Sequence, residues 1–123
     1  MISDLAMNPN VAINKGHPWS NADATDILRL LAKDQKLKLH LTKHACEQMN
    51  SRDLFVGDVM HVLRNGFVYE QPEKATQPGC FKYKIESSSP AGMRTVRIVV
   101  IPWINPPELK IVTVMWRDEP GHL

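Results

Sequence analysis

Residues 39–66 read LHLTKHACEQMNSRDLFVGDVMHVLRNG, and this stretch decides how the rest of the chain is arranged. Apolar and polar residues alternate over residues 37–41, which predicts a short, half-buried strand. Thr42 can cap a helix over about residues 43–50. After the polar break NSRD, a second helix is expected from Val56 to Arg64. Asn65 and Gly66 indicate its end, because glycine tolerates the left-handed conformation.

The flanking sequence predicts an α+β domain over residues 21–117. Upstream, residues 22–35 have cap-like residues and an apolar stripe at helical spacing, typical of a helix. Residues 1–20 have no periodicity and are expected to form a flexible arm, with Trp19 docking on the domain. Downstream, strands are expected at 67–69, 81–86, 94–101 and 109–116, separated by a loop at 71–79, a turn at 87–92 and a break at Asn105-Pro106-Pro107. The helices should pack on this antiparallel meander, and residues 118–123 should be an unstructured tail.

Strand period also assigns side chains to faces of the sheet. Phe81, Tyr83 and Ile85 should face the core, opposite Lys82, Lys84 and Glu86 in solvent. In the last strand, alternation predicts one face of Leu109, Ile111, Thr113 and Met115, opposite Lys110, Val112, Val114 and Trp116. Thr113 is therefore expected in the core.

Composition is that of an ordinary globular domain. The chain has 123 residues, 43% of them hydrophobic and 23% charged. No apolar run is long enough to span a bilayer, and the first residues lack a secretory signal, so a cytoplasmic protein is expected. Two cysteines, Cys46 and Cys80, are too few for a disulfide framework.

Positive charge is concentrated in two blocks. Residues 33–52 hold five Lys/Arg against two acids, and residues 81–117 hold six against two. Together the blocks could form one face that attracts phosphate. The alternative is two separate solvated surfaces.

The segments TKHACEQMNSRDL (42–54), DVMHVLRNG (58–66) and VTVMW (112–116) carry a family resemblance. In this order they resemble a bacterial domain of unknown function whose members typically read T-x-H-A-x-x-R-M-x-x-R-G-I, then D-V-x-x-V-L-x-x-G. That family is similar to the RelE/ParE-type toxin fold and to metal-independent ribonucleases. The resemblance implies a RelE-like fold and RNA cleavage, often by the toxin of a toxin–antitoxin pair, with RNA and an antitoxin protein as partners. The family's histidine maps to His44 and its second arginine to Arg52. Two positions depart from the pattern: Gln48 replaces the first arginine, and Asp53 replaces a glycine.

Metal-free RNA cleavage requires a base, an acid and cations around the phosphate. His44 suits acid or base chemistry, and Arg52 could clamp the phosphate. Lys82, Lys84 and Arg97 could line the same groove, and Trp116 could stack on a base. Each residue also has a structural interpretation. His44 could bind backbone at a helix start, Arg52 could cap carbonyls, Arg97 could be a paired framework residue, Trp116 could be packing, and the lysines could be a solvated strand side.

No cofactor or metal is expected. His40, His44 and Cys46 look like metal ligands at first, but residues 40 and 44 straddle a change from strand to helix. On the helix, Cys46 should point away from His44. Two functions therefore remain: a metal-independent endoribonuclease of the toxin type, or a non-catalytic module that binds protein or RNA. Gln48, which removes a cation, favours the second.

Overall fold

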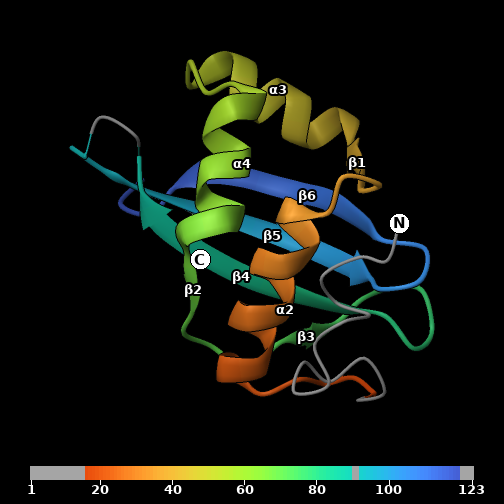
Figure 1. Ribbon diagram of the computed structural model, residues 1–123. Coiled ribbons are helices and arrows are strands. Elements are labelled where there is room, and N and C mark those ends of the chain that lie inside the picture. Colours follow the sequence, from red (N-terminus) through yellow and green to blue (C-terminus); the bar gives the residue numbers. More distant parts are fainter. Residues whose placement is uncertain (1–15, 90–91, 120–123) are drawn as a thin grey trace.

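The computed structural model describes residues 16–89 and 92–119, which form an α+β fold (Figure 1). Among these residues the helices are α2 (Asn21–Lys33), α3 (Lys43–Ser51) and α4 (Val56–Asn65). The strands are β1 (Lys38–Leu41), β2 (Phe67–Val68), β3 (Glu73–Lys74), β4 (Phe81–Ser88), β5 (Thr95–Trp103) and β6 (Glu108–Trp116). The sheet order is β1-β6-β5-β4-β2, and β3 pairs with β4. The predicted fold class is confirmed.

Polar caps start the helices. The Ser20 side chain accepts a hydrogen bond from the backbone N–H of Asp23 at the start of α2. The Thr42 hydroxyl accepts one from Ala45 N–H at the start of α3, as predicted. At the start of α4 the Asp58 carboxylate accepts the N–H of Phe55. These bonds satisfy donors that the first turn of a helix leaves free, and they fix where each helix begins.

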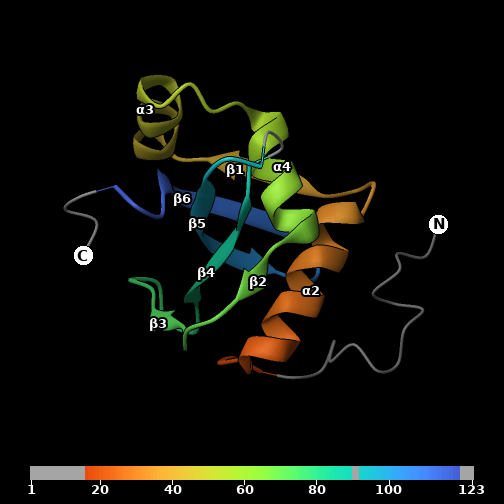
Figure 2. The same ribbon diagram turned by 90° about the vertical axis from the view of Figure 1, so that its left-hand side faces the viewer.

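Helices α2 and α4 lie side by side on one face of the sheet, and α3 lies by the β6 edge (Figures 1 and 2). The apolar stripes of α2 and α4 and the inward residues of β4, β5 and β6 form one core. Its fully buried large side chains include Ile27, Leu28, Leu31, Leu63, Tyr83, Ile85, Ile98, Leu109 and Ile111. The other face of β4 and β5 carries polar and charged side chains.

The sheet is mixed rather than a purely antiparallel meander. β1 pairs in parallel with β6, with Lys38 opposite Glu108 and Leu41 opposite Ile111. The neighbouring pairs β4–β5 and β5–β6 are antiparallel, as predicted. Strand β1 lies between α2 and α3 in sequence, and α3, α4 and the strands β2 to β5 separate it from its partner β6. Local alternation predicted the strand but carries no information on its partner.

A β-bulge in β6 overturns the predicted faces of the last strand. Val100 is opposite Ile111, but Val99 is opposite Thr113, so Val112 is the extra residue. A bulge exchanges the two faces of a strand beyond it. Val114 is therefore buried in the core and Thr113, the predicted core residue, lies on the other face, half-buried.

Four further expectations need correction. Gly66 ends α4 in an extended conformation (φ −81°), not a left-handed one. A glycine is required there because a Cβ atom would lie 2.6 Å from Val62 O and 2.7 Å from Glu86 O. The predicted loop at 71–79 contains β3, and β4 continues into the predicted turn as far as Ser88. Glu86, expected in solvent, is buried.

The ends of the described chain pack on the domain. Trp19 is buried, and its N–H donates to the Tyr83 hydroxyl at 2.9 Å. That hydroxyl lies 2.7 Å from His17 Nδ1, and the His17 ring packs against the Trp19 ring with a tilt of 30° between the two planes. The rest of the predicted arm, residues 1–15, lies outside the described residues. Of the predicted tail, Asp118 and Glu119 form ion pairs with Arg94 and Arg52, and residues 120–123 lie outside the description.

None of the helices in the described ranges has the length and apolar character needed to traverse a bilayer.

Candidate functional site

The residues of the α3 segment satisfy the outer edge of β6. Strand β1 ends at Leu41, so the later backbone groups of β6 have no strand beside them on that edge. At the bulge, the Thr42 hydroxyl donates to Val112 O at 3.2 Å. The Gln48 side-chain oxygen accepts Val114 N–H at 2.9 Å. Edge groups left unpaired in a buried position would destabilise the fold, so both side chains have a structural role.

Glu119, held by Arg52, satisfies a further backbone group of β6 beyond Val114. Glu119 Oε1 accepts the N–H of Trp116 at 2.7 Å. The Arg52 guanidinium binds both oxygens of Glu119, with Nε–Oε1 2.7 Å and Nη2–Oε2 2.5 Å, and donates to Gln48 O at 3.2 Å. The hydrogen bond to Glu119 raises the pKa of Arg52 above its ordinary value. Arg52 therefore caps α3, as its structural interpretation predicted, and clamps a carboxylate.

The backbone conformation of Asp53 accounts for the glycine that the family pattern has at this position. Its φ is +54°, in the left-handed region. The N–H of Leu54 binds Met49 O at 2.9 Å and the N–H of Asp53 approaches Asn50 O at 3.5 Å, which is a Schellman ending of α3. Glycine is favoured at such a position for backbone reasons, and aspartate tolerates it. The departure at Asp53 therefore concerns the turn rather than a catalytic group.

His44 lies one turn before Gln48 and is exposed. Within residues 16–89 and 92–119 its side chain makes no hydrogen bond or ion pair, so no backbone partner occupies it there. In this part of the chain His44 takes no part in satisfying the β6 edge. Its role, and that of Arg52 toward a phosphate, stay predictions.

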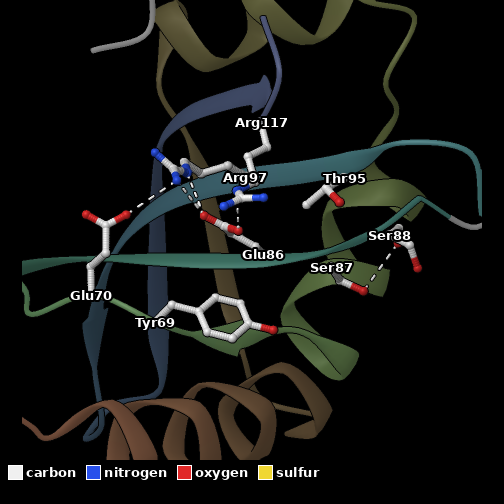
Figure 3. Close-up of a pocket in the computed structure, with 8 residues that line it drawn as sticks. All are labelled: Tyr69, Glu70, Glu86, Ser87, Ser88, Thr95, Arg97 and Arg117. Carbon is white, nitrogen blue, oxygen red and sulfur yellow. Dashed lines mark hydrogen bonds and ion pairs between the residues drawn. The ribbon is translucent and has the colours of Figure 1, made fainter.

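A hollow of about 370 Å³ opens on the face of the sheet away from α2 and α4 (Figure 3). Glu86 of β4 is opposite Arg97 of β5, and its carboxylate binds Arg97 Nη2 at 2.6 Å and Arg117 Nε at 3.1 Å. Only 6% of the Glu86 side chain is exposed. Arg97 also pairs with Glu70 at 3.3 Å. Two guanidinium groups thus hold one buried carboxylate at the floor of an open hollow.

Hydroxyl groups complete the walls of the hollow. The hydroxyls of Ser87, Ser88 and Thr95 line it together with the charged cluster, and Tyr69 adds its aromatic ring. In Figure 3, Tyr69 lies across β4 from Arg97 and Arg117. Hydroxyls and guanidinium groups are suitable partners for phosphate oxygens, which accept hydrogen bonds and carry negative charge.

The sequence-predicted cations are distributed around this cluster. Lys84 is 3.6 Å from Glu70, the carboxylate that also pairs with Arg97, so the structure brings these two cations together. Lys82 lies two residues earlier on β4, opposite Glu73 of β3. Neither His44 nor Arg52 lines this hollow or the one beside it.

A second hollow of about 410 Å³ adjoins the first and shares Thr95, Arg97 and Arg117 with it. Arg94 lines it and binds Asp118 at 2.7 Å; this hydrogen bond lowers the pKa of Asp118. The Arg94 guanidinium also lies 4.2 Å from the centre of the Trp116 ring. Trp116 is half-buried against the core, which agrees with the packing interpretation.

Sequence reasoning found Arg97, Lys84 and Lys82 but missed Glu86 and Arg117. The missing signal was tertiary, because only the β4–β5 register shows that Glu86 faces Arg97. Across residues 16–89 and 92–119, no group of three or more His, Cys, Asp or Glu side chains is arranged to hold a metal ion.

The sequence model of one protein family, described as a domain of unknown function (DUF4258), matches residues 41–116. No curated protein and no solved structure matches the chain. The matched residues begin at the end of β1 and run through the last residue of β6, so they include α3 and α4. They also include most residues that line the two hollows, but Arg117 and Asp118 lie just beyond the match. The chain therefore belongs to the DUF4258 family of domains of unknown function.

Proposed function

We propose that this chain is a metal-independent endoribonuclease of the toxin type, as its resemblance to RelE/ParE toxins implies, acting on the open face of its sheet. The observation that carries the proposal is the buried Glu86 carboxylate held between Arg97 and Arg117 at the floor of an open hollow. A carboxylate beside two fixed guanidinium groups combines a base with cations that can stabilise a phosphate.

The chemistry needs few groups. Glu86 exchanges one arginine contact for the 2′-hydroxyl of the RNA and takes its proton. The 2′-oxygen attacks the adjacent phosphorus, the bond from phosphorus to the 5′-oxygen breaks, and a 2′,3′-cyclic phosphate forms. The leaving 5′-oxygen takes a proton from water, and protonated Glu86 gives its proton to the resulting hydroxide, which restores the carboxylate. Arg97 and Arg117 stabilise the charge that develops on the phosphate oxygens during this displacement.

One observation favours a second function, a non-catalytic module that binds RNA or protein through the same face. In the described residues Arg97, Arg117, Lys84 and Arg52 are each paired with a carboxylate. A ligand that takes the place of these carboxylates on the cations, and does nothing more, would bind without reacting. The same argument applies to an antitoxin partner, whose acidic side chains could replace Glu70 on Lys84 and Arg97.

The test is cleavage of a single-stranded RNA in the presence of a metal chelator, with the product ends analysed for 2′,3′-cyclic phosphate. Glu86→Gln keeps the side-chain shape and should reduce the rate by about 10²- to 10⁴-fold. Arg117→Ala removes an exposed cation of the cluster and should also reduce it. Lys110→Ala, an exposed cation elsewhere on β6, is the matched control and should leave the rate unchanged.

His44→Ala distinguishes between the two candidate sites of the reaction, the surface beside α3 and the open face of the sheet at Glu86. If it abolishes cleavage while Glu86→Gln retains it, the reaction takes place beside α3, as the family pattern alone predicts. An active toxin should also arrest growth of the expressing host, and the inactivating substitution should relieve the arrest. A wild-type chain that binds RNA but neither cleaves it nor arrests growth would be the binding module.

A further inference from the structure

Two exposed aromatic rings lie next to the arginine hollow. Phe67 of β2 and Tyr69 just after it are 49% and 63% exposed, and their ring centres are 6.1 Å apart. Phe67 is opposite Glu86 in the β2–β4 register, so both rings belong to the edge of the sheet beside the charged cluster. Tyr69 itself lines the hollow. Exposed aromatic rings are unusual at an edge strand and often mark a binding surface.

Phe67 is held in place from one side. The Arg29 guanidinium of α2 lies 4.4 Å from the centre of its ring. Arg29 is fixed in turn by hydrogen bonds to Gly66 O at 2.9 Å and Asn65 O at 3.1 Å, the carbonyl groups at the end of α4. A ring fixed in this way loses little conformational entropy when a flat ligand stacks beside it.

The charges nearby indicate which ligand the rings receive. Lys84 lies on β4, Arg97 on β5 and Arg117 just after β6, and these three cations have two carboxylate partners, Glu70 and Glu86. Single-stranded nucleic acid combines flat bases with a phosphate chain, and its binding sites combine aromatic rings with cations. In a duplex the bases are stacked inside the helix and cannot reach such rings. Two tilted rings beside a cationic hollow therefore fit a single strand better than an apolar protein surface.

We infer that Tyr69, supported by Phe67, stacks on the base of the nucleotide whose phosphate lies in the Arg97–Arg117 hollow, which makes single-stranded RNA the substrate class. This inference rests on the proposed function of that hollow. Tyr69 acts here through its ring, not its hydroxyl. It is a binding residue, and it leaves the reacting atoms to the charged cluster.

The test measures binding of a fluorescein-labelled single-stranded RNA of twelve nucleotides by anisotropy, against the same strand annealed to its complement. Tyr69→Ala should weaken single-strand binding by roughly 5- to 150-fold. Tyr69→Phe, which keeps the ring, should bind like wild type. Phe55→Ala is the matched control, because Phe55 is a 70% exposed aromatic residue that does not line the hollow. Its affinity should equal that of wild type.

Five outcomes decide the inference. The pattern above, with the duplex bound more weakly than the single strand, supports it. Equal affinity for duplex and single strand overturns it, as does a Tyr69→Phe loss as large as that of Tyr69→Ala. If Arg117→Ala abolishes binding while Tyr69→Ala has no effect, the stacking inference fails and the proposed site stands. If the wild-type chain does not bind RNA at all, both fail.

Discussion

The β6 edge and the open face of the sheet use similar side chains for different purposes. At the β6 edge, Thr42, Gln48 and Arg52 satisfy backbone groups directly or through Glu119. On the open face, Arg97 and Arg117 bind the buried carboxylate of Glu86 within a hollow of about 370 Å³. The family-pattern positions Thr42, Gln48 and Arg52 therefore hold the structure together in this chain. The comparison shows that a guanidinium in such a pattern is not by itself a site.

The largest expected effect on stability is at Glu86, on the open face of the sheet. Glu86→Ala would leave Arg97, whose side chain is largely buried, without its main carboxylate, and should lower the free energy of unfolding by about 3 kcal/mol. Urea unfolding followed by circular dichroism measures this difference. Glu70→Ala is the control, because Glu70 pairs with the same arginine from a half-exposed position and should change stability by less than about 1 kcal/mol. Similar small values for both variants would mean that the cluster behaves as solvated surface.

Gln48 tests the other region. Gln48→Ala removes the acceptor of the Val114 N–H at a buried position, and should lower the free energy of unfolding by about 1–3 kcal/mol. The neighbouring Glu47 is exposed, so Glu47→Ala should stay within about 0.5 kcal/mol of wild type. Neither variant should lower RNA affinity in folded protein if the ligand binds on the open face. If Gln48→Ala were as stable as wild type, the structural role assigned to the α3 segment would be wrong.

A smaller effect is expected at Asp53, where φ is +54°. Glycine adopts this conformation without strain and alanine does not, so Asp53→Gly should be more stable than Asp53→Ala by about 1 kcal/mol, with wild type between them. Thermal unfolding of the three proteins gives the order. Cleavage or RNA binding should be unaffected by Asp53→Gly. A large change in either activity would show that the carboxylate, and not the turn, matters at this position.

The smallest expected effect is a pH dependence of the free energy of unfolding. Burial lowers the pKa of His17, while the unfolded side chain titrates near its ordinary value of about 6.5. The unfolded state therefore binds more protons in this range, so the stability contributed by neutral His17 is complete above about pH 6.5 and is lost as pH falls through the lowered value. Unfolding titrations between about pH 5 and 8, roughly 1.5 units either side of the ordinary value, should show this slope. It should be reduced in His17→Gln. An unchanged slope would assign the titration to another group.

The buried contact of His17 also affects its partner, Tyr83. Burial raises the pKa of Tyr83 to about 12, so its hydroxyl stays protonated and can donate to neutral His17 while it accepts the Trp19 N–H. Docking of Trp19 was expected from its character alone, whereas the tyrosine that receives it could not be named, because the two residues are 64 positions apart in sequence.

Several parts of this protein follow from the sequence alone. The cap Thr42, the apolar stripes of α2 and α4 and the alternation of β4 and β5 are local patterns, and each led to an element that the structure contains. The cations Lys84 and Arg97 were also recognised locally. Local rules suffice here because a cap or a stripe depends on residues within a few positions of one another.

Tertiary structure alone decided the rest. The parallel pairing of β1 with β6, the bulge at Val112 that buries Val114 in place of Thr113, and the use of Gln48 on the β6 edge all depend on residues far apart in the chain. So does the burial of Glu86 between Arg97 and Arg117. The physical reason is that strand register and partner choice are set by packing of the whole core, and only they determine which charges meet.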